Sequence, residues 1–216
     1  MTNTQTRIIS AICIGVIFLV AIFGFRPLFY IIMYLVASVM LLEWYKITKD
    51  FIVYKYLGLF FIPVAITSLL LVSSYDLYGW ILLTYFSIIW TVDTMAMVGG
   101  KLLKGPKLAP NLSPKKTFSG LLVGISCGTI VPYILKLIPS YNLIYFTVEN
   151  NFAMFVTCFI FALIAQASDL FVSFFKRKSQ IKDSGSVIPG HGGMLDRFDS
   201  IILTAPLLLL YLNSNL

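Results

Sequence analysis

Long runs of almost uninterrupted apolar residues are the feature that most constrains the fold of this 216-residue chain. About 20 apolar residues are needed to cross the hydrocarbon of a bilayer. Seven runs approach that length, at roughly 8–24, 27–43, 56–74, 78–99, 118–138, 152–175 and 199–213. Because the runs lack the alternation of a lipid-facing strand, they favour helices over a β-barrel. The sequence therefore predicts an all-α, polytopic integral membrane helical bundle with about seven transmembrane helices.

The composition supports a membrane protein, since 59% of the residues are hydrophobic and only 12% are charged. A soluble domain could not bury that much apolar surface. The loops between the runs are too short to fold by themselves, so we expect one membrane domain over residues 1–216. Within it, residues 1–76 form N-terminal helices and residues 77–216 carry the polar motifs. Any chemistry is then built from helix ends and connecting loops.

The distribution of Lys and Arg predicts the orientation of the chain. If the seven spans alternate in direction, only Arg26 and Lys136 lie on one side, and the other fourteen cations lie on the opposite side. Short loops rich in Lys and Arg stay in the cytoplasm, which places the N-terminus there. The net charge of +7 is then explained by the orientation of the chain in the membrane and by attraction to anionic lipid. No nucleic-acid partner is expected.

The loop after the fourth run, GGKLLKGPKLAPNLSPKKTFSG, is strongly basic. It carries five lysines together with prolines and glycines, and no acidic residue. Such a backbone turns often and leaves N–H groups free to face a ligand. The loop suits a multiply charged anion, although it contains no GxxxxGK[ST] phosphate-binding motif.

Two carboxylates, Asp93 and Asp169, lie inside predicted spans. A carboxylate at membrane depth costs roughly 2.5–3.5 kcal/mol, so such residues usually face the interior of the bundle. The alternative interpretation is that each carboxylate is a structural partner for a neighbouring lysine or for a helix N-terminus. Asp169, Ser173 and Lys176 are spaced four and three residues apart, which predicts one polar helical face leading toward the cytoplasm.

The segment that follows this polar face mixes carboxylates, cations and glycines. Lys182 and Asp183 are adjacent, and Asp196 and Asp199 lie near the start of the last apolar run, at the positive end of a helix. Carboxylates among cations, with no thiolate, suit Mg²⁺ bound together with phosphate oxygens. The residues thus predict a cytoplasmic-face site for a polyphosphate and Mg²⁺, open to lipid, and leave the substrate undetermined.

The stretch SFFKRKSQIKDSGSVIPGHGGMLDRFD, residues 173–199, resembles the signature of the phosphatidate cytidylyltransferase family, the CDP-diglyceride synthetases. The matching elements are S-x-x-K-R, K-D, P-G-H-G-G and D-R-x-D. SPKKTFSG, residues 113–120, is similar to a second family motif, with Ser119 where Glu is usual. Asp93 also resembles a family position. The resemblance covers roughly residues 90–200.

The resemblance implies the reaction of CTP with phosphatidic acid to give CDP-diacylglycerol and pyrophosphate. It also implies a bacterial inner (plasma) membrane with the active site facing the cytoplasm, a homodimer, and Mg²⁺, with room for a second, monovalent or divalent, cation. The expected metal ligands are Asp169, Asp196 and Asp199. The expected catalytic residues are Lys176, Arg177, Lys182, Asp183, His191 and Arg197. The expected substrate-binding residues are Ser113, Lys115, Lys116, Thr117, Ser173, Gly192 and Gly193.

The phosphate of phosphatidic acid is an anion at neutral pH, so its attack on CTP requires no general base. His191 is therefore expected either to donate a hydrogen bond to phosphate or to hold the PGHGG turn. Two other functions stay open on the residues alone. One is a related CTP-dependent enzyme that acts on another anionic lipid, and the other is an anion transporter or channel.

Overall fold

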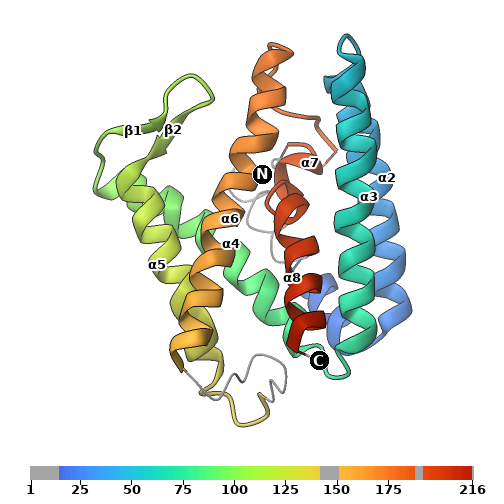
Figure 1. Ribbon diagram of the computed structural model, residues 1–216, viewed down its shortest axis with the longest axis vertical. Helices are drawn as coiled ribbons and strands as arrows, with labels where there is room; N and C mark the ends of the chain where they lie inside the picture. The colour runs from blue at the N-terminus through green and yellow to red at the C-terminus, as the bar shows by residue number, and fades with distance from the viewer. Residues whose placement is uncertain (1–14, 142–150, 188–191, 216) are drawn as a thin grey trace, which may run out of the picture.

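The computed structural model describes residues 15–141, 151–187 and 192–215, and it shows helices that run roughly along one long axis (Figure 1). Within these residues, five helices are long and apolar enough to cross a membrane. They are α2 (Arg26–Ile47), α3 (Ile52–Tyr75), α4 (Trp80–Leu102), α5 (Phe118–Leu135) and α6 (Asn151–Lys178). The chain is a helical membrane bundle, as the apolar runs predict.

The five long helices coincide with the second to the sixth predicted spans. Of the first predicted span, residues 15–23 are helical, and the rest lies outside the described residues. The last predicted span corresponds to α8 (Ile201–Asn215), which has 15 residues. A helix of that length covers roughly 22 Å, less than the roughly 30 Å of a hydrocarbon core. Five of the seven predicted spans are thus found as long helices, and the other two correspond to the first span and to α8.

A small antiparallel hairpin, which the sequence analysis did not predict, interrupts the helical fold after α4. Strand β1 (Lys107–Ala109) pairs with β2 (Ser113–Thr117), with Lys107 opposite Thr117 and Ala109 opposite Ser113. The hairpin extends from one end of the bundle above α5 (Figure 1). The basic loop is therefore partly ordered by strand pairing, and Thr117 ends β2 directly before α5 begins.

Small residues bring α4 and α5 into very close contact. A Cβ atom on Gly120 would lie 2.4 Å from the backbone oxygen of Ala96, and one on Gly124 would lie 2.7 Å from that of Val92. Only glycine permits such an approach between helix backbones in a membrane. The side chain of Thr117 caps α5 by accepting a hydrogen bond from the N–H of Gly120 at 3.1 Å. The end of β2 is thereby held beside the C-terminal half of α4.

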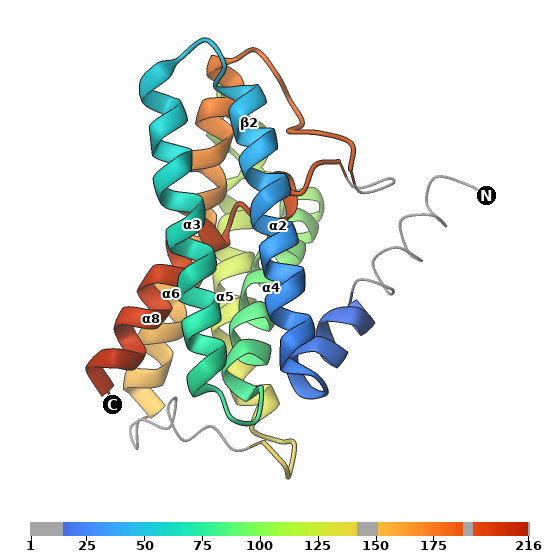
Figure 2. The same ribbon diagram turned by 90° about the vertical axis from the view of Figure 1, so that its right-hand side faces the viewer.

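The other side of the bundle is formed by α2 and α3, with the segment after α6 crossing over the same end toward α2 (Figure 2). The hydroxyl of Ser179 donates a hydrogen bond to the backbone oxygen of Ile47. The buried ring of Trp44 packs on Phe175 with centroids 4.9 Å apart, and its Nε1 donates to the backbone oxygen of Tyr54 at 2.8 Å. These contacts fix the end of α6 against α2 and α3.

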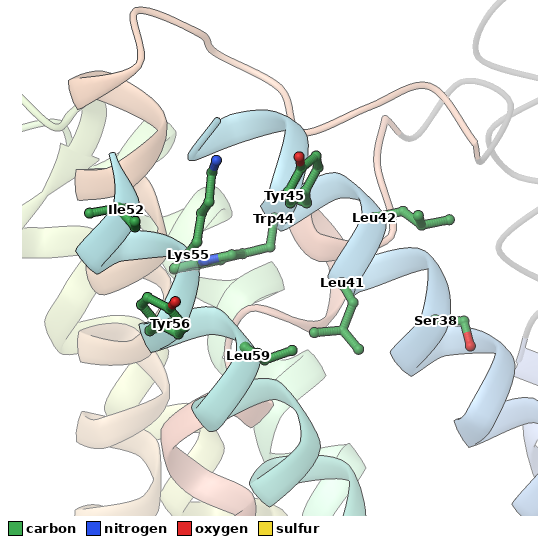
Figure 3. A pocket seen from close by; sticks show the side chains of 9 residues that line it. All are labelled: Ser38, Leu41, Leu42, Trp44, Tyr45, Ile52, Lys55, Tyr56 and Leu59. Carbon is green, nitrogen blue, oxygen red and sulfur yellow. The ribbon is translucent and has the colours of Figure 1, made fainter. Parts of the chain in front are cut away.

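A groove of about 610 Å³ opens between α2 and α3 (Figure 3). Trp44 contributes to its wall, and a Cβ atom on Gly58 would lie 2.1 Å from that indole ring. Of the nine lining residues labelled in Figure 3, only Lys55 is charged. None of the nine is a predicted site residue, so this groove is not the candidate site for a triphosphate.

We expect Gly120→Ala to reduce stability, because the added methyl group would lie inside contact distance of α4. Overpacking of this kind costs about 1–3 kcal/mol, which corresponds to roughly 2–4 °C in Tm per kcal/mol for a chain of this size. The measurement is thermal unfolding of the detergent-purified protein. Gly15→Ala is the matched control, since a Cβ atom there meets nothing within 4 Å. Equal melting temperatures for the two variants would contradict the packing argument.

Candidate functional site

Three carboxylates from separate elements form an acidic cluster within the bundle. Asp93 comes from α4, Asp169 from α6, and Asp199 directly follows the short helix α7 (Leu195–Phe198). The three side chains interact electrostatically with one another. Asp199 is buried, with 6% of its surface exposed. Carboxylates assembled in this way at membrane depth repel one another, so the cluster requires cations or hydrogen-bond donors.

Lys116, near the end of the hairpin, provides a neutralising charge that contacts the cluster directly. Its Nζ lies 2.6 Å from Oδ2 of Asp169 and donates to Oε1 of Gln166 at 3.1 Å. Nε2 of Gln166 in turn donates to Oδ1 of Asp93 at 3.1 Å. The basic loop and the two intramembrane carboxylates are therefore joined in one continuous network. The Lys116 and Asp169 side chains keep 18% and 23% of their surface exposed, so the network is reachable from outside the bundle.

Hydroxyl groups complete the network around the carboxylates. Ser173 donates to Oδ1 of Asp169 at 3.2 Å, and Ser200 donates to Oδ2 of Asp93 at 3.3 Å. Oδ1 of Asp199 accepts the backbone N–H of Ser200 at 2.8 Å. The Asp169–Ser173 bond confirms that these two residues share the predicted polar face of α6. Each carboxylate has at least one donor, which lowers the cost of keeping it charged.

Asp196 lies in a second cluster, with partners of its own. Its Oδ1 is 2.7 Å from Nζ of Lys176, and its Oδ2 accepts the backbone N–H groups of Ser184 at 2.8 Å and Gly193 at 3.2 Å. Burial alone would raise the pKa of Asp196. The hydrogen bond and charge of Lys176, together with the two N–H groups, outweigh burial and hold the pKa below its usual value. Asp196 is therefore ionised throughout roughly pH 5–8.

The remaining predicted residues take varied positions. The guanidinium of Arg177 donates to the backbone oxygens of Leu112 and Ile181, so it braces the hairpin against the end of α6. Arg197, in α7, acts electrostatically on Asp93. Four predicted residues are exposed: Lys115, Lys182, Asp183 and Arg197. Ser113 begins β2, Thr117 caps α5, and Gly192 adopts a left-handed φ of 89°. His191 lies outside the described residues.

The structure adds polar residues that the predicted site set did not contain. Gln166 bridges Lys116 and Asp93, and its position three residues before Asp169 on the same helix was a usable signal. Asp93 was recognised as an intramembrane carboxylate but was not included among the metal ligands. Glu43, at the end of a predicted span, is buried and bonded to the segment before α7. Asp93 and Asp169 were selected as carboxylates inside predicted spans, and the same rule also selects Glu43.

The donor chemistry of the acidic cluster fits a hard divalent cation, because three carboxylates from separate elements offer only oxygen atoms as ligands. In this structure Asp169 holds the ammonium group of Lys116. Across residues 15–141, 151–187 and 192–215, no three His, Cys, Asp or Glu side chains converge closely enough to form a ready metal site. The acidic cluster is therefore a candidate cation site by chemistry rather than by preformed geometry.

Comparison with known proteins identifies relatives over most of the chain. The sequence pattern of the cytidylyltransferase family matches residues 46–215. A phosphatidate cytidylyltransferase of Rickettsia felis is 50% identical over 206 residues, which cover 95% of this chain and 91% of the relative. The enzyme of the same name from Rickettsia bellii is 50% identical over 207 residues, covering 96% and 90%. The one from Staphylococcus haemolyticus is 40% identical over 123 residues, covering 57% and 45%.

We expect Asp196→Asn to lower the Tm of the purified protein by several degrees more than Asp169→Asn. Only 8% of Lys176 is exposed, so loss of the Asp196 charge leaves a buried ammonium group without its counter-ion. The Lys116–Asp169 pair is more exposed and more strongly screened. Adding Lys176→Met to Asp196→Asn should restore part of the lost stability. Equal losses in the two single variants would contradict this distinction.

Proposed function

Because the chain belongs to the cytidylyltransferase family, we propose that it is a phosphatidate cytidylyltransferase of phospholipid biosynthesis. It transfers CMP from CTP to phosphatidic acid and gives CDP-diacylglycerol and pyrophosphate. The observation that carries the proposal is the pairing of Lys116 with Asp169 at 2.6 Å. This contact joins the SPKKT motif to the helix that leads into the signature of residues 173–199. The 50% identity of full-length relatives supports the same activity.

The reaction needs charge stabilisation more than proton transfer. An oxygen of the phosphatidate phosphate attacks the α-phosphorus of CTP, and the bond from that phosphorus to the bridging oxygen of the β-phosphate breaks. Pyrophosphate leaves with the electron pair of that bond, and the ionised nucleophile gives up no proton. The barrier is the repulsion between two anions together with the charge that builds on pyrophosphate. Fixed cations lower both contributions.

The cations are proposed to act from two motif regions. Lys115 and Lys116 would contact the nucleotide or lipid phosphates from the hairpin, with Ser113, Thr117 and Ser173 as hydrogen-bonding neighbours. From the signature of residues 173–199, phosphate charge would be neutralised by Lys176, Arg177, Lys182 and Arg197. Asp183 and His191 are assigned to the same site by the family resemblance. Gly192 and Gly193 would allow a phosphate to approach the backbone closely.

Mg²⁺ is proposed as the cofactor, held by Asp169, Asp196 and Asp199, with Asp93 as a further candidate ligand. When bound, Mg²⁺ would neutralise triphosphate charge and so assist the departure of pyrophosphate. Asp196 would keep its bonds to Lys176 and the loop while offering remaining lone pairs to the cation. A second cation, monovalent or divalent, is compatible with the number of carboxylates. The acidic cluster's oxygen donors support this proposal.

The proposed setting is the bacterial inner membrane, with seven spans, a cytoplasmic N-terminus and the active site facing the cytoplasm. Three cation-bearing segments lie at one end of the bundle: the turn between α2 and α3, the hairpin, and the segment after α6 (Figure 1). Lys and Arg concentrate on the cytoplasmic side. A homodimer is proposed from the family resemblance, and the molecular mass of the detergent-solubilised particle tests it.

The activity is tested by incubating purified protein with labelled CTP, phosphatidic acid and Mg²⁺. We expect a lipid-soluble nucleotide product and an equal amount of pyrophosphate, and no product when EDTA replaces Mg²⁺.

Lys116→Met and Asp169→Asn should each reduce kcat by about 10²–10³-fold, as removal of one charge-stabilising group does elsewhere. Lys101→Met, an exposed lysine near the end of α4, is the matched control and should keep wild-type activity. Absence of the lipid nucleotide from wild-type reactions would refute the proposed function.

A further inference from the structure

Glu43 is a buried carboxylate of α2, and within the described part of the chain its hydrogen-bond donors come from residues between α6 and α8. Its Oε2 accepts hydrogen bonds from Oγ of Ser184 at 2.7 Å and from the N–H of Leu195 at 2.8 Å. Its Oε1 accepts the N–H of Met194 at 3.0 Å. Only 3% of Glu43 is exposed. The carboxylate thus bridges a sequence separation of 141 to 152 residues.

The surroundings of Glu43 are shaped to fit its carboxylate. A Cβ atom on Gly185 would lie 2.5 Å from Oε1 of Glu43, and one on Gly193 would lie 2.6 Å from Oε2. Neither ion pair found among the described residues includes Glu43. Its charge is therefore balanced mainly by backbone N–H groups and a hydroxyl. An arrangement that needs two glycines and three donors specifies one position for this segment.

The same part of the chain is also held by Asp196. Oδ2 of Asp196 accepts the N–H groups of Ser184 and Gly193, and Glu43 accepts from Ser184 and the two residues after Gly193. Glu43 and Asp196 therefore both bind Ser184 and both bind the stretch from Gly193 to Leu195. Lys182 and Asp183, which are both proposed to contact the substrate, directly precede Ser184.

From this geometry we propose that Glu43 is a positioning residue, which holds residues 182–187 and 192–195 so that Lys182 can bind the triphosphate of CTP. The inference rests on the proposed function. Glu43 touches no substrate in this assignment and acts through Ser184, Met194 and Leu195. It lies before residue 46, where the match to the family pattern begins. Its contribution therefore comes from a helix outside both motifs.

The test compares Glu43→Gln with wild type in steady-state kinetics. Gln keeps the size of the side chain but turns an NH₂ group toward donors, so at least one hydrogen bond to a charged acceptor is lost. Loss of that bond should displace the residues that Glu43 holds and raise KM for CTP about tenfold, which corresponds to about 1.4 kcal/mol. KM for phosphatidic acid should change by less than about threefold. A mere loss of folded enzyme would lower kcat and leave both KM values unchanged.

Asp50→Asn is the matched control, because Asp50 is an exposed carboxylate at the same end of the bundle. It should leave both KM values at the wild-type level. If the wild-type enzyme is active and Glu43→Gln leaves KM for CTP unchanged, the positioning role is overturned. Inactive wild type would instead refute the proposed function, so the two failures are distinguishable.

A double-mutant cycle with Gly185 provides a second test that does not depend on Glu43→Gln folding well. The Cβ atom of Gly185→Ala meets only atoms of Glu43 within 3.5 Å. Gly185→Ala should therefore raise KM for CTP in the wild-type background and add little to Glu43→Ala, since the obstructing carboxylate is then absent. Ser184→Ala, which removes one donor, should give a smaller increase in KM for CTP. Fully additive effects of Gly185→Ala and Glu43→Ala would contradict the proposed coupling.

Discussion

The cost of placing a carboxylate at membrane depth governs the polar interior of this protein. Each such group requires donors or cations nearby, and in a helical bundle most of these come from other helices or from loops folded back onto them. Asp93 obtains Gln166 and Ser200, and Asp169 obtains Lys116 and Ser173. The requirement for partners therefore gathers segments that are distant in sequence.

Close helix packing makes these contacts geometrically possible. Because Gly120 and Gly124 let α5 lie directly on α4, the residues just before α5 are brought beside the carboxylates of α4 and α6. Lys116 reaches Asp169 from this position. A bulkier α4–α5 interface would move the hairpin outward, and the ammonium group would no longer reach its partner. The small residues thus contribute to the site although they carry no functional group.

Hydropathy and spacing were sufficient to predict the helical bundle and the polar face of α6, because both follow from local periodicity. The hairpin was not predicted, since its strands are short and their pairing depends on packing against α5. Gln166 could have been found from its place one turn before Asp169. The partners of Glu43 could not, because they are largely backbone N–H groups up to 152 residues away, and no side-chain pattern records them. Long-range bonds to the backbone are the part of a site that a single sequence conceals.

Helix α6 connects the two polar clusters and determines how they can cooperate. Asp169 belongs to the acidic cluster, and Lys176, seven residues later on the same face, binds Asp196 at the start of the second cluster. Two helical turns separate these positions by roughly 10 Å along the axis. Because both positions lie on one continuous helix, they keep this spacing, and the residues held by Glu43 and Asp196 lie beside the C-terminal end of α6. A single helix therefore fixes the position of the acidic cluster relative to the residues that Glu43 and Asp196 hold.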